Sequence, residues 1–400
     1  MRTVLMRVFS EPYRVFFLAA GLYAAFAMLV WELWLGGLFA GGMMGGMPFA
    51  APPHLWHAHE MIFGYASAAL GGFFLTAVPN WTSSRAAARA FVVAAALVWL
   101  AGRVAVWVSG ILPPFLVALV DLAFLPMLGV RIMLMLAKRP KPQNVAFLGF
   151  LALVWGGNLL VHLEWLGLAG TLDVGMRVGI LALCLMIAVL GGRVTPGFTR
   201  NALKRRGVAE TSLPRTRKPL DLAAVVLIGL VPLALMAGVP VALTGTLAIA
   251  GGAAQVVRIA FWGAHRVLGQ PILWALHLGM AMLGVGLILW GLSLLGRGSE
   301  VAALHVLGIG AVGGMTLAVM SRAVLGHTGR ALVAPGAVAV AYGLVAMAAA
   351  LRWAGATMGG GVYVPVMLAT GALWIAGFAL YVAALWPAFT GPRKVAANES

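Results

Sequence analysis

The stretch PPHLWHAHEMIFGYASAALGGFFLTAVPNW, residues 52–81, places three histidines and a glutamate before an apolar segment long enough to cross a bilayer. The ionisable side chains at its start are His54, His57, His59 and Glu60. Imidazoles and carboxylates are costly in or beside lipid unless they have partners, so a metal ion, a haem or a transferred proton is expected here. The stretch therefore predicts a membrane helix that begins at a chemically active site.

Composition extends this prediction to the whole chain. Of the 400 residues, 62% are hydrophobic and 9% are charged. Apolar runs of about 20 residues recur, and they are continuously apolar rather than alternating, which excludes a β-barrel. We predict an all-α, polytopic membrane protein with about twelve transmembrane helices, at residues 14–35, 59–79, 88–108, 113–136, 145–167, 174–192, 220–238, 241–262, 271–293, 301–320, 333–352 and 362–386.

The positive charges predict the orientation of these helices. With this layout, most of the 27 Lys and Arg residues fall on one side of the membrane. That side is expected to be cytoplasmic, so both termini are predicted to be cytoplasmic. This bias also accounts for the net charge of +17, and we expect no nucleic-acid partner. The exceptions, expected on the outer side, are Arg103, Arg177, Arg297 and Arg352.

The longest polar connection suggests a division of the chain. Residues 194–219 form a basic segment that we expect to be a cytoplasmic loop. It would separate a first six-helix half, residues 1–193, from a second, residues 220–390, with a cytoplasmic tail at 391–400. Both halves would lie in the lipid bilayer.

Histidines from distant helices are expected at one depth of the membrane. His54, His57 and His59 begin one predicted helix, His162 ends another, and His305 begins a third. A metal ion in a helix bundle needs neutral imidazoles from several helices at one level. These five residues are therefore candidate metal ligands, the alternative being hydrogen-bonded interfacial histidines.

His277 lies deeper in an apolar segment and needs a partner there. It is a candidate metal ligand, in particular for haem b, or it forms a hydrogen bond to a carbonyl or hydroxyl group of a neighbouring helix. Haem b could also take His162 or His305. The cations Arg193 and Arg322 could hold haem propionates, although positive-inside placement explains them equally well.

Carboxylates beside these histidines have expected roles of their own. Glu60 follows His59 and is the candidate catalytic group, either orienting that imidazole or handling protons. Asp121 and Arg103 lie on neighbouring predicted helices across a short turn. We expect them to form a buried, structural ion pair.

Three stretches resemble the NnrS family of bacterial inner-membrane proteins: HLWHAHEMIFGYASAALGGFFLTAVPNWT at 54–82, GGRVTPGFTRNAL at 191–203 and LHVLGIGAVGGMTLAVMSRAVLGHTGR at 304–330. The resemblance implies a multi-pass protein with haem and copper, linked to nitric oxide and to defence against nitrosative stress in denitrifying and related bacteria. It carries no ligand assignment, so the histidines named above are inferred from their positions.

These observations favour a haem and copper protein that binds, senses or turns over nitric oxide. In a quinol-linked nitric oxide reductase, membrane quinol would donate the electrons. Two alternatives remain open. Twelve helices in two halves also suit a proton-coupled secondary transporter, and a non-catalytic membrane partner could deliver haem or metal. The oligomeric state is left open.

Overall fold

The computed structural model describes residues 2–42, 46–356, 358 and 360–394, and the regular structure within these ranges is helical throughout. Twelve helical segments in them are long and apolar enough to cross a membrane, which confirms the all-α prediction of a multi-pass membrane protein. The cytoplasmic location of the termini stays a prediction, and residues 395–400 of the expected tail lie outside the described residues.

The chain forms two compact units, and the first comprises Met1–Gly179, Met320–Leu332 and Phe378–Ser400. The helices that lie wholly in this unit are α1 (Arg2–Val8), α2 (Pro12–Phe39), α3 (Pro53–His59), η1 (Glu60–Tyr65), α4 (Ala66–Thr82), α5 (Arg89–Trp107), α6 (Pro114–Leu122), α7 (Phe124–Leu136) and α8 (Pro142–Trp165).

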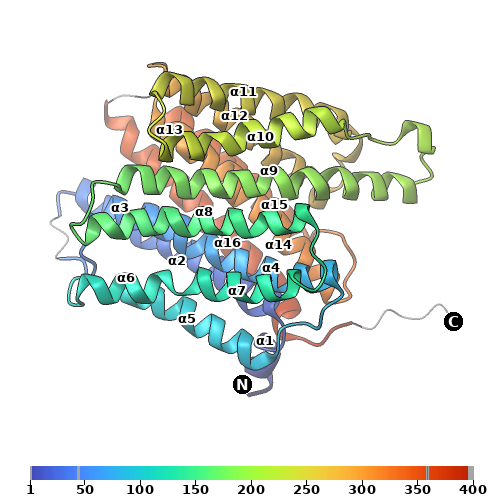
Figure 1. Ribbon diagram of the computed structural model, residues 1–400, viewed down its shortest axis with the longest axis horizontal. Helices are drawn as coiled ribbons and strands as arrows, with labels where there is room; N and C mark the ends of the chain where they lie inside the picture. The colour runs from blue at the N-terminus through green and yellow to red at the C-terminus, as the bar shows by residue number, and fades with distance from the viewer. Residues whose placement is uncertain (1, 43–45, 357, 359, 395–400) are drawn as a thin grey trace. The chain divides into compact units, whose positions relative to one another are not determined.

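The second unit comprises Ile180–Val319 and Val333–Gly377. Within it, α10 (Lys218–Met236), α11 (Val241–Ile259) and α12 (Pro271–Leu294) pack side by side (Figure 1). The division at residues 194–219 that the sequence suggests stays a prediction. Three helices, α9 (Leu172–Arg205), α14 (Gly314–His327) and α16 (Tyr363–Thr390), contribute residues to both units. The other helices of the second unit are η2 (Glu210–Ser212), α10 (Lys218–Met236), α11 (Val241–Ile259), η3 (Ala260–Trp262), η4 (Ala264–Val267), α12 (Pro271–Leu294), α13 (Glu300–His305), η5 (Val306–Gly313), α15 (Gly336–Gly355) and η6 (Gly360–Val362).

Two predicted helices differ from the observed ones. The helix expected at 174–192 continues through Pro196 to Arg205, because NALKRR consists largely of good helix formers, and the chain turns only at Gly207 with φ +75°. The helix expected at 113–136 is interrupted between α6 and α7. This interruption matters for the site described below.

Close contact between α8 and α9 fixes one wall of the first unit. A Cβ atom on Gly175 of α9 would lie 2.7 Å from the carbonyl oxygen of Gly157 on α8, so glycine is required for this approach. Gly157 immediately precedes Asn158, which is part of the site.

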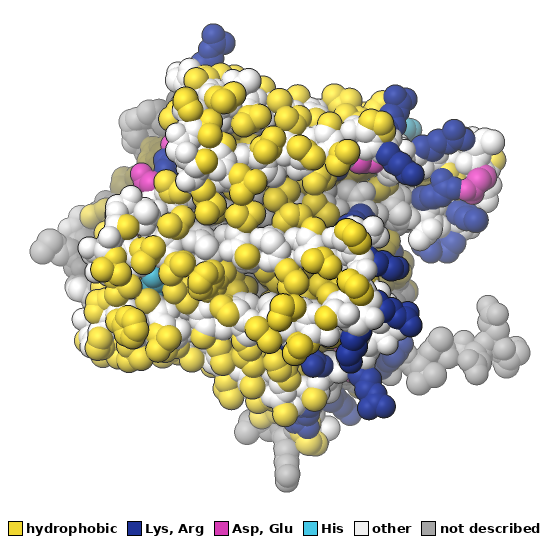
Figure 2. Space-filling view, viewed as in Figure 1, with side chains coloured by type: hydrophobic (Ala, Val, Ile, Leu, Met, Phe, Trp, Pro, Cys, Tyr) yellow, Lys and Arg dark blue, Asp and Glu magenta, His cyan; other side chains and the backbone are white. Residues whose placement is uncertain are grey.

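The outer surface of the first unit suits a lipid environment. Figure 2 shows hydrophobic side chains along α7 and α8 and Lys and Arg side chains gathered near the loop that joins them, where Lys138, Arg139 and Lys141 are exposed. Cations at helix ends are typical of membrane proteins.

Candidate metal centre

Three buried side chains from three helices converge in the first unit. His59 ends α3, Asp121 lies in the last turn of α6, and His162 lies in the last turn of α8. One potential ligand atom from each lies within 4.8 Å of the other two. Asp121 Oδ2 lies 2.8 Å from His162 Nε2 and 3.4 Å from His59 Nε2. All three side chains are buried, and His59 is fully inaccessible.

A network of ionised groups surrounds these ligand atoms. Arg103 on α5 donates a hydrogen bond from Nη1 to Glu60 Oε1 at 2.6 Å and another from Nη2 to Asp121 Oδ1. Tyr23 on α2 donates its hydroxyl hydrogen to Glu60 Oε2. Two carboxylates and one guanidinium leave one net negative charge when both imidazoles are neutral. An uncompensated charge at membrane depth is costly, so the network favours one added proton or one monovalent cation.

The contacts of His59 indicate which group could carry such a proton. Its Nδ1 lies 2.8 Å from Glu60 Oε1, and its Nε2 lies 2.8 Å from Asn158 Oδ1. The Asn158 amide nitrogen donates to Asp121 Oδ2 at 2.9 Å, which fixes its oxygen towards His59. Both ring nitrogens of His59 therefore face acceptors, which is the hydrogen-bonding pattern of an imidazolium.

A π-helical turn places Glu60 in this network. Glu60–Tyr65 form the wide turn η1 between α3 and α4, and such turns are frequent at functional sites. Gly64 within it leaves room for the ion pair, because a Cβ atom there would lie 2.8 Å from Arg103 Nη1 and 2.9 Å from Glu60 Oε2. The Gly64 carbonyl oxygen accepts a hydrogen bond from Trp99 Nε1 at 3.0 Å. The turn is therefore held by the same helix, α5, that carries Arg103.

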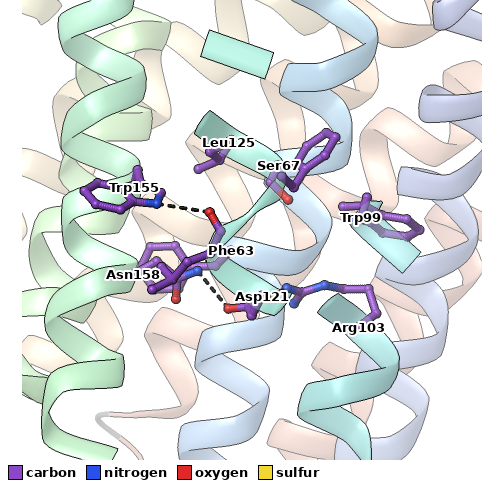
Figure 3. A pocket seen from close by; sticks show the side chains of 10 residues that line it. Phe63, Ser67, Trp99, Arg103, Asp121, Leu125, Trp155 and Asn158 are labelled. Carbon is purple, nitrogen blue, oxygen red and sulfur yellow. Dashed lines mark hydrogen bonds and ion pairs between the residues drawn. The ribbon is translucent and has the colours of Figure 1, made fainter. Parts of the chain in front are cut away.

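The interruption between α6 and α7 positions Asp121. Pro126 has no N–H group to donate to the carbonyl of Leu122, four residues earlier. Trp155 Nε1 on α8 donates to that carbonyl instead at 3.1 Å, as the dashed line beside Trp155 in Figure 3 shows. The broken helix is thus bonded to α8 one residue after Asp121, on the helix that carries Asn158 and His162.

A small cavity lies against this centre. Figure 3 shows Arg103, Asp121 and Asn158 around it, together with the rings of Phe63 and Trp99. It has about 10 Å³ of space for the centre of a water-sized molecule. This is close to the minimum for one water molecule, so the cavity admits a ligand of two or three atoms at most.

The donor set fits a metal ion. Two imidazole nitrogens and one carboxylate oxygen are ligands that copper, zinc and iron(II) accept. Histidines that bind metals usually donate their second ring N–H to a carboxylate, as His59 Nδ1 does to Glu60. In a metal-bound form His59, Asp121 and His162 would be the ligands, and Glu60, Arg103 and Asn158 would orient them.

His277 forms a separate polar site on α12 in the second unit. The side chain is 5% exposed, and Nε2 lies 2.8 Å from Thr199 Oγ1 on α9. Thr199 donates its one hydroxyl hydrogen to the Thr195 carbonyl at 2.8 Å, so Nε2 carries the hydrogen of the bond to Thr199. Nδ1 keeps its lone pair, for which the described residues provide no hydrogen-bond partner. The expected bond to a neighbouring hydroxyl is present, and one nitrogen remains able to bind a metal.

The other candidate histidines lie outside the group of three. His54 is exposed one turn before His57, whose ring stacks on Trp31 with a centroid distance of 5.1 Å. His305 belongs to the second unit and donates from Nδ1 to the Val301 carbonyl at 2.7 Å. Their proposed roles as metal ligands stay predictions.

The two arginines expected to hold haem propionates belong to different units. Arg193 is exposed on α9 in the second unit, and Arg322 is partly buried on α14 in the first. His162, the third histidine considered for haem, is committed to the contact with Asp121. A haem-binding role for these residues stays a prediction.

The sequence anticipated only part of the centre. The buried pair of Arg103 and Asp121 is confirmed, but Asp121 also contacts both histidines. Asn158 and Tyr23 were not anticipated. A usable signal existed for Asn158, because it precedes His162 by four residues and therefore shares its face of α8.

Comparison with known proteins assigns the family. No curated protein matches the chain. The family described as NnrS protein matches residues 7–393 and so includes both units. Because this match covers nearly all of the 400 residues, the chain belongs to the NnrS family, whose membership supports a membrane protein linked to the nitric oxide response.

Proposed function

We propose that this chain is a haem and copper protein of the bacterial inner membrane that binds or turns over nitric oxide and protects against nitrosative stress. The observation that carries the proposal is the convergence of His59, His162 and Asp121, with Glu60 hydrogen-bonded behind His59. Family membership supports the link to nitric oxide.

Copper is the metal that the charge of the centre favours. One net negative charge on two carboxylates and one arginine is cancelled by a monovalent ion, and copper, which imidazoles bind, has the monovalent form Cu(I). A divalent ion would leave one net positive charge in the same buried volume, which costs more at membrane depth. Binding would displace the proton between His59 and Asn158.

Haem b is proposed at His277, whose buried Nδ1 has no hydrogen-bond partner among the described residues. Arg193, which belongs to the same unit as His277, stays the proposed propionate partner. When bound, haem iron and copper would supply one-electron chemistry and a site for nitric oxide. In the catalytic form of this proposal quinol would donate electrons, and Glu60 would hold or pass a proton at its Oε1 atom. The small cavity beside Asp121 supports a diatomic ligand there.

A second candidate function, proton-coupled transport, is favoured by one specific observation. Hydrogen bonds connect Glu60 to His59 and to Arg103, and a further bond connects Arg103 to Asp121. Buried carboxylates and histidines of this kind serve as proton relays in transporters. Metal content distinguishes the two functions.

The test uses the full-length protein purified in detergent from cells supplied with copper and haem precursor. Copper and iron per chain are measured by mass spectrometry, and the absorption spectrum is recorded with and without nitric oxide. We expect about one copper per chain and a Soret band that shifts with nitric oxide. His59→Ala and His162→Ala should lose the copper, whereas His54→Ala, a matched change on the exposed side of the same helix as His59, should retain it.

Replacing His277 tests the proposed haem site separately. His277→Ala should lose or shift the Soret band while it retains copper, because His277 and the copper ligands belong to different units. A colourless protein without metal would overturn the proposal in favour of transport. Copper retained by His59→Ala and His162→Ala as fully as by the control His54→Ala would overturn the ligand assignment.

A further inference from the structure

A second, larger cavity in the first unit is lined by cations. It has a volume of about 320 Å³ and is open to the surface. It lies where the start of α2, the end of α14 and the segment after α16 meet. The lining side chains that matter here are Arg7, Tyr13, Arg14, His327 and Arg393, with Glu11 as the acidic one.

Positive charge in this cavity exceeds negative charge. Among the residues that the structure describes, no ion pair includes Arg7, Arg14 or Arg393, although Glu11 lines the same cavity. The carbonyl end of α16 adds about half a negative charge through its helix dipole. Three guanidinium groups still exceed these two contributions, so the cavity has a net attraction for anions.

Arg14 is built into the cavity wall rather than displayed on the surface. It is 4% exposed, and its Nη1 donates to the carbonyls of Ala388, Phe389 and Gly391 at 3.1, 2.7 and 2.8 Å. Its Nε donates to Tyr13 OH at 3.2 Å. These bonds fix the guanidinium plane and leave Nη2 without a hydrogen bond to any described residue. A fixed donor of this kind costs little conformational entropy when it binds a ligand.

Two exposed arginines and two stacked rings form the rest of the cavity lining. Arg7 and Arg393 are exposed, so their long side chains can close over a ligand. The rings of Tyr13 and His327 stack with a centroid distance of 5.2 Å and form a rigid, partly polar side of the cavity. Guanidinium groups on a rigid frame are the usual recognition chemistry for phosphate, which accepts two parallel hydrogen bonds from each.

We propose that this cavity binds a phosphate group. The group could be presented by the headgroup of an anionic phospholipid or by a free phosphate compound, and both use the same contacts with Arg7, Arg14 and Arg393. The site lies at the ends of membrane helices, where basic pockets bind anionic headgroups. The inference does not depend on haem, copper or nitric oxide.

The experiment measures binding to the delipidated, full-length protein in neutral detergent. The probes are short-chain phosphatidylglycerol, short-chain phosphatidylcholine and inorganic phosphate, with native mass spectrometry for the lipids and thermal stabilisation for all three. The double variant R7Q/R393Q removes two exposed charges and spares the buried Arg14. Its matched control, R85Q/R89Q, removes two exposed arginines that do not line the cavity.

Of phosphatidylglycerol and inorganic phosphate, we expect at least one to bind the wild type and R85Q/R89Q at least about tenfold more tightly than R7Q/R393Q. Each basic group contributes a several-fold gain in affinity. Preference for phosphatidylglycerol over both other probes would identify a lipid headgroup as the ligand. Binding of inorganic phosphate without binding of the lipid would identify a free phosphate compound. The proposal is overturned if neither anionic probe binds, or if R7Q/R393Q binds as tightly as R85Q/R89Q.

Discussion

Replacing Asp121 by asparagine tests the centre with a change of one atom. Asp121 Oδ2 accepts hydrogen bonds from Asn158 Nδ2 at 2.9 Å and from His162 Nε2 at 2.8 Å. In Asp121→Asn the remaining oxygen stays with Arg103, because guanidinium groups only donate. The new amide nitrogen then faces two donors and can accept from neither.

The expected cost follows from these contacts. A hydrogen bond to a charged group contributes about 1.5 kcal/mol or more, and two are lost, so unfolding becomes easier by about 3 kcal/mol. For a compact unit of this size the loss lowers Tm by about 6 °C or more. Copper affinity should fall at least about 100-fold, because even indirect partners of metal ligands change affinity by about 10- to 100-fold and Asp121 is a proposed ligand.

Asp173→Asn is the matched control. Asp173 belongs to the same unit and forms a surface ion pair with Arg177 at 3.6 Å, with its own side chain 85% exposed. Such pairs contribute about 0–1 kcal/mol. Thermal unfolding in detergent and competition with a Cu(I) chelator are measured for both variants. The reasoning is refuted if Asp121→Asn matches Asp173→Asn in Tm and copper affinity. A lower Tm with unchanged copper affinity would show that Asp121 is structural and not a ligand.

Three further predictions concern the same unit. Gly64→Ala should lower both Tm and copper content, because its Cβ atom would lie 2.8 Å from Arg103 Nη1, whereas Gly149→Ala, a helix-interior position with open space around its Cβ, should lower neither, as thermal unfolding and metal analysis can show. Trp155→Phe should lower the stability by about 1 kcal/mol, measured as a lower Tm, since the Leu122 carbonyl loses its donor and α7 cannot replace it. Acid should release copper, because ligand imidazoles must be neutral: bound metal measured after dialysis should be retained at about pH 8 and fall towards about pH 5, and constant occupancy over this range would count against histidine ligands.

Twelve spans could be predicted because hydrophobic length alone determines them. The predicted span 241–262 agrees with the observed Val241–Trp262, since Pro240 and Gly263 limit the helix. Local departures were not predictable in the same way. The π-helical turn at Glu60–Tyr65 and the break after Leu122 depend on bonds from Trp99 and Trp155 on other helices. These bonds arise from tertiary packing, which hydropathy does not report.

The types of residue in the centre were predictable from the sequence, but the particular residues that form it were not. His59 and His162 were expected to share a depth, and their proximity through Asp121 is present. Five histidines met the same depth criterion. Depth in the membrane fixes only one coordinate of a side chain, whereas convergence on one metal ion requires all three. Asp121 was expected to pair with Arg103 alone, because one cation is enough to neutralise one carboxylate. A carboxylate has two oxygens and several lone pairs, and this one accepts hydrogen bonds from three donors, on Arg103, Asn158 and His162.

Charge balance connects the two proposed functions of this network. A proton on His59 and a Cu(I) ion between His59, His162 and Asp121 would each cancel the same single negative charge. They would also compete for the same atom, because His59 Nε2 must release its hydrogen bond to Asn158 before it can bind a metal. Metal binding should therefore release about one proton per ion, and a proton relay should be blocked while the metal is present. His162 places a second imidazole 2.8 Å from Asp121 Oδ2, and two imidazoles with one carboxylate form a donor set that copper accepts. This donor set supports the metal-binding proposal.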